Sequence, residues 1–419
     1  FNVIWEVMMT SRERVKKVFL HEPVDRVPLF ELTVANPILS KVLGRKIEGM
    51  VTGESKIASL RANMKDRAER KKLIERNVNG MVDAYKKIGF DMLWIRPFEY
   101  LTPVEMAMND FITPNMIFDV KIESIDENTY KISDEEFGFW SIEEYSPKSN
   151  TCPTISDCIS EKGEKEFERY IQVLEKRSNA FGEHIQDGLQ GLKIAVDRSK
   201  VEDIFILGCA DISFPTFYPW IGMYMEMMAM GSELVSRYME VTTAGTIELL
   251  RAQLEMGVDG IMGTNDWCYR SGSLMSPNHF RKYLAPYLKR IVDECHAYGV
   301  PYIKHLDGNT MPIIDILVNE VGIDGLHSIE PTAGMDIGWV KKTYGEKIVL
   351  LGNIDCGNTL VLGSKEDVIN ETKDIIRTAA PGGGFIFASS NCIHSAVDMN
   401  NFETMIQTVL KLGKYPLNS

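Results

Sequence analysis

Several features that mark other classes of protein are missing from this chain. Its seven cysteines form no CxxC pair, so neither a disulfide framework nor a paired-cysteine metal site is expected in a chain of this length. No apolar run approaches the ~18 to 20 residues of a membrane span. The opening FNVIWEVMMTSRERV has no basic stretch and no small-residue cleavage site, which argues against a signal peptide. We therefore expect a cytoplasmic protein.

The chain also has fewer basic than acidic side chains. The 419 residues include 46 Lys and Arg against 59 Asp and Glu, a formal net charge of −13. No local run of basic side chains offsets this balance, which argues against a nucleic-acid partner. With 44% hydrophobic and 25% charged residues, the composition excludes disordered and collagen-like classes and is typical of a globular protein.

A joint between a helix and a strand recurs along the chain. In KIGFDMLWI (87–95), MGVDGIMG (256–263) and VGIDGLHSI (321–329), a glycine follows an amphipathic segment and a short apolar run comes next. Glycine suits the left-handed residue that ends a helix, and the apolar run suits a strand buried on both faces. Further joints of this kind are AYGVPYIKHL (297–306), YGEKIVLLGNI (344–354) and PGGGFIFASS (381–390).

Eight such units predict the fold. With DRVPLFELT (25–33) and DIFILGCAD (203–211), eight strands alternate with helices, which favours a (β/α)8 barrel of the α/β class. A doubly wound open sheet is the alternative, but no G-x-G-x-x-G follows the first strand. Short β-prone runs separated by polar turns at 121–145 indicate a meander. We expect one domain over 1–419, with a β-rich insertion at roughly 100–165 between the second and third strands.

The predicted strand ends carry many ionisable, amide and thiol side chains. Catalytic groups of a parallel barrel come from the carboxyl ends of its strands, so we expect the active site there. In chain order these side chains are Glu31, Arg96, Cys209, Asp211, Asn265, Asp266, Cys268, His305, Asp307, Asn309, His327, Glu330, Asn353, Asp355, Cys356, Ser389, Ser390, Asn391, Cys392 and His394.

A metal site is one interpretation of this end. His305 and Asp307 are two residues apart on a strand, so both project to the same face. Imidazole, carboxylate and thiolate are zinc ligands, and a catalytic zinc takes three of them and leaves one position open. Cys392 or Cys356 would supply the third, although each of these thiols taken alone suits simple packing better than metal binding. The alternative for His305 and Asp307 is a hydrogen-bonded structural pair.

Asp266 is the candidate acid. It adjoins Trp267, and a carboxyl group against an aromatic wall has a raised pKa. The alternative is that Asp266 caps a following helical turn. Cys209 suits either a pocket lining or a turn.

Over nearly its whole length the chain resembles the uroporphyrinogen decarboxylase superfamily, whose fold is a (β/α)8 barrel. The resemblance rests on several motifs in the expected order. They are SRERVKKVFLHEPVDRVPLFE (11–31), GSLMSPNHFRKYLAPYLKRI (272–291), KHLDGN (304–309), GLHSIEPTAGMD (325–336), LLGNID (350–355) and APGGGFIFASSNCIH (380–394).

The superfamily has two enzymatic branches, and the positions at which this sequence departs from the motifs of each branch distinguish between them. Uroporphyrinogen decarboxylases follow the first strand with an arginine-rich R-Q-A-G-R loop that binds the substrate carboxylates. Here the stretch reads FELTVANPIL (30–39), with Glu31 and no arginine. An octacarboxylate would meet a negative charge and no bidentate cation, so decarboxylation is the second candidate.

The other branch comprises corrinoid-dependent methyltransferases. Those acting on coenzyme M carry a zinc site written H-x-C with a further cysteine near the last strand. Here the pattern reads His305-Leu306-Asp307, with Asn391-Cys392 near the end. An oxygen ligand in place of a thiolate suits polarisation of an ether or alcohol oxygen. The resemblance thus implies O-demethylation in anaerobic metabolism.

The expected enzyme moves a methyl group from a small methoxylated or otherwise methylated substrate to the Co(I) corrinoid of a partner protein. It would be a monomer or homodimer with a zinc cofactor, and the non-enzymatic alternative is a binding protein on the same fold. The expected residues are Asp266, His305 and Asn309 for catalysis, His305, Asp307 and Cys392 for the metal, and Glu31, Arg96, Cys209, Glu330, Asn391 and His394 for the substrate.

Overall fold

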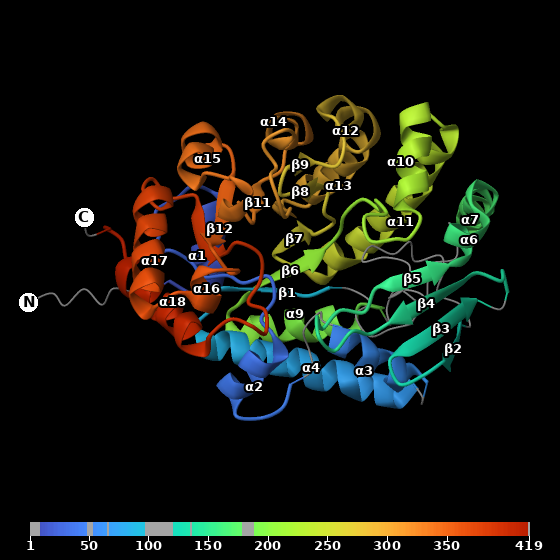
Figure 1. Ribbon diagram of the computed structural model, residues 1–419. Helices are drawn as coiled ribbons and strands as arrows, with labels where there is room; N and C mark the ends of the chain where they lie inside the picture. The colour runs from blue at the N-terminus through green and yellow to red at the C-terminus, as the bar shows by residue number, and fades with distance from the viewer. Residues whose placement is uncertain are drawn as a thin grey trace, which may run out of the picture.

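Seven parallel strands form the central sheet, in the order β1-β6-β7-β10-β11-β12-β13 (Figure 1). The computed structural model describes residues 9–47, 53–64, 67–96, 120–134, 136–177 and 188–417. The strands are β1 (Met92–Trp94), β6 (Phe205–Cys209), β7 (Gly260–Gly263), β10 (Tyr302–His305), β11 (Gly325–His327), β12 (Val349–Ile354) and β13 (Phe385–Ser389).

The segment of the predicted first strand, 25–33, closes this sheet into a barrel. Leu29 pairs in parallel with Phe387 of β13, and the Phe387 N–H donates to the carbonyl of Pro28 at 2.9 Å. On the other side, the N–H of Asp91 donates to the Leu29 carbonyl at 2.8 Å. The segment forms single bridges and no regular strand, because Pro28 lacks an N–H and the Leu29 N–H bonds to the Asp91 carboxylate. The (β/α)8 fold is confirmed, with an irregular first strand.

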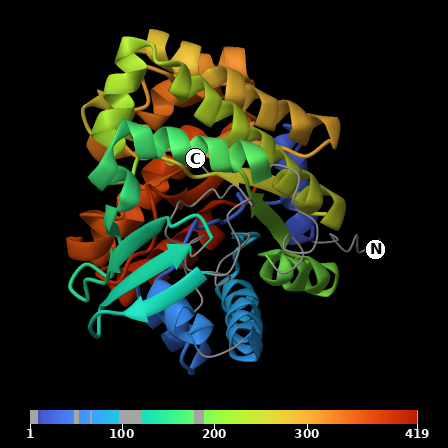
Figure 2. The same cartoon turned by 90° about the vertical axis from the view of Figure 1, so that its right-hand side faces the viewer.

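Helices surround the barrel on its outer side (Figures 1 and 2). None of those in the described ranges is long and apolar enough to cross a membrane. The helices are α1 (Ser11–Phe19), α2 (Asn36–Leu43), α3 (Gly53–Asn63), α4 (Arg67–Ile88), α6 (Cys158–Lys162), α7 (Glu164–Arg177), α9 (Gln190–Glu202), α10 (Ile221–Met230), α11 (Glu233–Met256), α12 (Pro277–Tyr283), α13 (Ala285–Ala297), α14 (Ile314–Ile316), α15 (Ile337–Tyr344), α16 (Thr359–Leu362), α17 (Lys365–Ala379) and α18 (Met399–Leu412).

The recurring glycine–strand joint has a structural explanation. Its glycines at 89, 257 and 322 lie in the left-handed region, with φ of 96°, 93° and 84°. The aspartate two positions later stands at the amino end of the next strand, where its carboxylate accepts a backbone N–H from the neighbouring strand. Asp91 accepts from Leu29 at 2.8 Å, Asp259 from Ile206 at 3.1 Å and Asp324 from Tyr302 at 2.7 Å. Each joint therefore ends a helix and ties two strands together.

The arginines of the opening motif lie at this amino end. Arg14 is buried and donates to Asp25 at 2.5 Å and to Asp91 at 2.7 Å. Arg26 donates to both oxygens of Asp91, at 2.7 and 2.9 Å. Since active sites of such barrels lie at the opposite end, these arginines stabilise the fold.

The insertion leaves the barrel after β1 and contains a four-stranded antiparallel sheet in the order β2-β3-β4-β5. Its described strands confirm the predicted β-rich segment, whereas residues 97–119 lie outside the described ranges. Figure 2 faces this sheet, which packs beside α3 and α7: Lys56 donates to the buried Glu143 at 2.5 Å, and the Arg169 guanidinium stacks 4.1 Å from the Phe139 ring centre. The strands are β2 (Val120–Ser124), β3 (Thr129–Asp134), β4 (Trp140–Glu144) and β5 (Thr154–Asp157).

Candidate functional site

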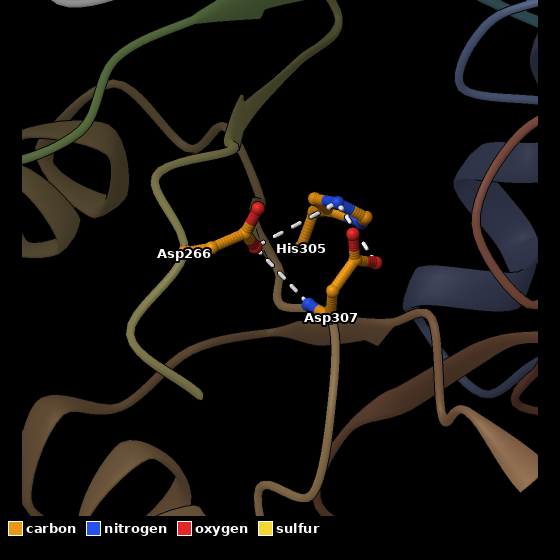
Figure 3. Close-up of side chains that lie close together, drawn as sticks. All are labelled: Asp266, His305 and Asp307. Atoms are coloured by element: carbon orange, nitrogen blue, oxygen red, sulfur yellow. Dashed lines mark hydrogen bonds and ion pairs between the residues drawn. The ribbon is translucent and has the colours of Figure 1, made fainter. Parts of the chain in front are cut away.

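Three ligand-type side chains meet at the carboxyl ends of two neighbouring strands. Asp266 follows β7, His305 is the last residue of β10, and Asp307 lies two residues beyond it. Nε2 of His305 is 3.5 Å from Oδ1 of Asp307 and 3.9 Å from Oδ1 of Asp266. Figure 3 shows both carboxylates turned toward the imidazole ring. The predicted same-face arrangement of His305 and Asp307 is thus present, and Asp266 joins it.

Burial shifts the pKa values of His305 and Asp307. His305 is 3% exposed, and burial, reinforced by the neighbouring His327 and Lys304, holds the pKa of His305 well below its usual range. The imidazole is therefore neutral at physiological pH. Burial, together with the charges of Asp266 and Glu330, raises the pKa of Asp307 to about 8.

Hydrogen bonds hold the two carboxyl groups and the turn that carries Asp307. Asn391, after β13, donates from Nδ2 to Oδ2 of Asp307 at 2.6 Å. The backbone N–H of Asp307 donates to Oδ1 of Asp266 at 3.1 Å, so this carboxylate bridges two strands. Glu330, after β11, accepts the N–H of Gly308 at 2.8 Å. Gly308 has φ of 80°, and a Cβ there would lie 2.5 Å from the Tyr269 carbonyl oxygen, so this turn requires glycine.

The donor set fits a divalent metal ion. In the described part of the chain, the ligand atoms of Asp266, His305 and Asp307 lie within 4.8 Å of one another. Oδ1 of Asp307 is buried and has no hydrogen-bond partner, and its 3.5 Å separation from the His305 nitrogen exceeds hydrogen-bond length. Two ligands each ~2.0–2.1 Å from a tetrahedral zinc stand roughly 3.3 Å apart, close to that separation. One nitrogen and two carboxylate oxygens form a set that zinc accepts, with a position left open.

Cys392, the third ligand expected from the sequence, is not part of this group. Its thiol lies near Cys356 and Thr33, and burial raises the pKa of Cys392 to about 12. Asp266 occupies the third place in the cluster instead.

A buried ion pair supports the loop that carries Asp266. Lys304 and Asp211 are both fully buried and 2.5 Å apart. Lys304 also donates to the carbonyl of Asn265 at 2.7 Å and stands 4.0 Å from the centre of the Trp267 ring. The Asn265 N–H in turn donates a hydrogen bond to the Asp211 carboxylate at 3.0 Å. These contacts fix the residues on both sides of Asp266.

Glu31 lies apart from the cluster. It is fully buried and accepts from both the N–H and the hydroxyl of Ser389, at 2.8 and 2.7 Å. The carboxyl group thereby continues the contact between the irregular first strand and β13, and burial raises the pKa of Glu31 to about 8. Its position gives it a barrel-closing role, and its expected contact with the substrate stays a prediction.

The remaining expected residues line the same end without joining the cluster. Arg96 lies two residues beyond the end of β1 and is half-buried. Cys209 ends β6 and is buried, with its backbone bonded to Gln253. Asn309 accepts the N–H of Met311 and so stabilises the turn after β10. His394 bonds to the carbonyl of Cys356 at 3.0 Å.

Sequence reasoning gave no role to His327, which the structure brings against His305. The two rings are joined between their Nδ1 atoms at 2.7 Å, and they are register partners on β10 and β11. The sequence places both residues at strand ends, but only the pairing of the two strands reveals the contact. Lys304 was missed as well, because a lysine inside a strand gives no sign of being buried.

Comparisons with known proteins agree with this fold. The uroporphyrinogen decarboxylase (URO-D) family profile matches residues 221–412. A uroporphyrinogen decarboxylase of Coxiella burnetii (strain Dugway 5J108-111) is 24% identical over 186 residues, covering 42% of this chain and 48% of the relative. That of Myxococcus xanthus (strain DK1622) is 29% identical over 181 residues, covering 43% and 49%. The chain thus spans about half the length of the curated relatives it matches.

A solved structure covers far more of the chain. The methyltransferase from Methanosarcina mazei superposes with a TM-score of 0.59 over 96% of this chain and 99% of its own, at 18% sequence identity. At this identity the likeness shows the fold.

Proposed function

We propose that this chain, whose residues 221–412 match the URO-D family profile, is a methyltransferase of the uroporphyrinogen decarboxylase superfamily. It would take a methyl group from a small methoxylated or otherwise methylated substrate and transfer it to the Co(I) corrinoid of a partner protein. The observation that carries this proposal is the cluster of Asp266, His305 and Asp307 at the mouth of the barrel. It places a neutral imidazole 3.5 and 3.9 Å from the carboxyl groups of Asp307 and Asp266.

The reaction defines what the site must supply. The Co(I) centre attacks the methyl carbon, the C–O bond breaks with its electron pair remaining on oxygen, and a proton is needed there to form the alcohol or phenol. An unassisted alkoxide or phenoxide leaves poorly, so an electrophile must face the oxygen. A zinc ion held by Asp266, His305 and Asp307 would supply Lewis-acid polarisation at that oxygen.

The side chains of the chain itself prepare this position. Asn391 holds Oδ2 of Asp307, which turns Oδ1 toward His305. Glu330 holds the turn at Gly308 and keeps the Asp307 backbone in place. A carboxyl held protonated near neutral pH, as burial holds Asp307, is also a proton donor for the leaving oxygen when no metal is bound.

Two further observations bear on the choice between branches. The neighbour that matches nearly the full length of both chains bears the name methyltransferase, whereas the relatives with the name uroporphyrinogen decarboxylase match about half. The mouth carries the carboxyl groups of Asp266, Asp307 and Glu330, a poor environment for a polycarboxylate. Methyl transfer is therefore favoured, and decarboxylation of uroporphyrinogen is the second candidate, supported by those names.

The test uses the purified full chain, loaded with zinc, and free cob(I)alamin as methyl acceptor. Methoxylated aromatics and methylated amines are offered in turn, and loss of the Co(I) absorbance is followed. Methylation by the wild type but not by His305→Ala supports the proposal. Absence of methyl transfer from every donor, combined with release of CO2 from uroporphyrinogen, would establish the decarboxylase instead.

A further inference from the structure

The two buried histidines at the mouth of the barrel, His305 and His327, are joined by a hydrogen bond between their rings. His305 and His327 stand opposite each other on adjacent parallel strands, so both side chains project to the same face of the sheet. Their ring centres are 4.9 Å apart, and the Nδ1 atoms approach to 2.7 Å. His327 is fully buried, and the edge-to-face ring of Phe30 lies 5.8 Å from it. Because both rings are buried, each Nδ1 has to find its hydrogen-bond partner in the other ring and not in water.

Only two arrangements satisfy this short contact. Each neutral imidazole carries one N–H and one lone pair, so one Nδ1 must donate and the other accept. If His305 accepts, its own proton sits on Nε2 and faces the carboxylates of Asp307 and Asp266. Those oxygens are 3.5 and 3.9 Å away, beyond the usual length of an N–H···O hydrogen bond. The proton on Nε2 would then lie buried without an acceptor.

If His305 donates instead, its Nε2 offers a lone pair toward the cluster. The remaining proton of His327 then sits on Nε2, away from the cluster. The backbone of Ser389 acts to raise the pKa of His327, against the lowering by burial, and so favours a proton on this ring. In this arrangement the outer N–H of the pair belongs to the ring that contacts the Ser389 backbone, and the His305 nitrogen that faces the two carboxyl groups carries a lone pair.

We infer that His327 is a positioning residue: its Nδ1 accepts the Nδ1 proton of His305 and so fixes the tautomer in which His305 Nε2 is a free lone pair aimed at Asp266 and Asp307. The inference deepens the proposed function and rests on it, since a metal at this cluster requires that lone pair. Partners of this kind also fix the ring orientation of a metal-ligating histidine, and their loss typically weakens metal binding 10- to 100-fold.

The first measurement reads the tautomers directly in the full, metal-free chain. Histidine ring nitrogens are labelled with ¹⁵N, and the His305 signals are assigned by their loss in His305→Ala. The expected spectrum has the His305 proton on Nδ1 and the His327 proton on Nε2. A His305 proton on Nε2 would overturn the inference. This reading needs no metal, so it stands even if zinc fails to bind and the proposed function loses its Lewis acid.

The second measurement is the affinity for zinc alone, by competition with a chelator. In His327→Asn, the side-chain amide keeps an acceptor near the position of Nδ1, whereas His327→Leu removes it. We expect affinity within a few-fold of wild type for the first and about 10- to 100-fold weaker for the second, with His279→Leu on α12 unchanged. Wild-type affinity in a folded His327→Leu would contradict the inference; if that variant does not fold, the ring spectrum of the wild type decides.

Discussion

Asn391 donates a 2.6 Å hydrogen bond to Oδ2 of Asp307, which connects the loop after β13 to the loop after β10. This bond sets which carboxylate oxygen faces His305. Replacing Asn391 with alanine should therefore weaken zinc binding about 10- to 100-fold, as is usual when a ligand loses its supporting contact. Asn400→Ala, at the exposed start of α18, is the control. Zinc affinity equal to that of the control would show that Asp307 needs no such support.

The variant Asp266→Asn removes the negative charge of Asp266 but keeps the shape of its side chain. The asparagine Oδ1 still accepts the Asp307 N–H, so the fold should be preserved while the side chain loses its negative charge and its capacity to act as the acid expected from the sequence. We expect single-turnover methyl transfer to fall by about 10² to 10⁴ with little change in thermal midpoint. The control is Asp336→Ala, which removes the cap of α15 and should cost about 0.5–2 kcal/mol at an unchanged rate per folded molecule. A lowered midpoint with a normal rate would make Asp266 purely structural.

The buried Glu31 should give stability a distinctive pH dependence. Burial raises the pKa of Glu31 from 4.5 to about 8, so between these values the folded chain keeps a proton that the unfolded chain has lost. The free energy of unfolding then falls as pH rises, by up to about 1.4 kcal/mol per pH unit. Glu31→Gln should remove this slope. The raised pKa of Asp307 acts in the same direction but is common to both chains, so the difference isolates Glu31.

Urea unfolding of wild type and Glu31→Gln at several pH values from 5 to 8 provides the measurement. The two stability curves should converge at low pH and separate as pH increases, with the glutamine variant the more stable at pH 8. Parallel curves would mean that Glu31 is ionised in the folded chain.

Breaking the ion pair between Lys304 and Asp211 should lower the free energy of unfolding strongly, and a second substitution should restore much of it. Both side chains are fully buried, so Lys304→Met leaves an unpaired carboxylate in the core, which costs about 3–5 kcal/mol. Adding Asp211→Asn removes the charge but keeps the oxygen that accepts the Asn265 N–H. We expect urea unfolding to show much of the loss restored in the double variant. A single variant within about 1 kcal/mol of wild type would contradict the buried pair.

Much of the fold was readable from local pattern. Residues 368, 372, 375, 376 and 379 follow the helical period and form the buried face of α17, which begins at the capping box of Ser364 and Asp367. The glycines of the joints end helices because they adopt positive φ. The first strand was predicted only in outline, since its bridging depends on the Asp91 carboxylate, which is distant in sequence.

The candidate site was predictable only along single strands. The spacing of His305 and Asp307 placed them on one face, because that follows from strand geometry alone. Contacts between strands depend on which strands are neighbours and in which register, so neither His327 nor the third member of the cluster followed from the sequence. Pairing of β7 with β10 brought Asp266 to the place expected for Cys392.

The fate of the methyl group decides whether the chain is a methyltransferase. The zinc-loaded chain is mixed with one equivalent of cob(I)alamin and a methoxylated aromatic donor labelled with ¹³C in the methoxy group, and the label is followed by NMR in a single turnover. We expect the label to move to cobalt and the donor to be released as its phenol, with no label transfer in His305→Ala. A label that stays on the donor, while the same preparation converts uroporphyrinogen to coproporphyrinogen, would contradict it.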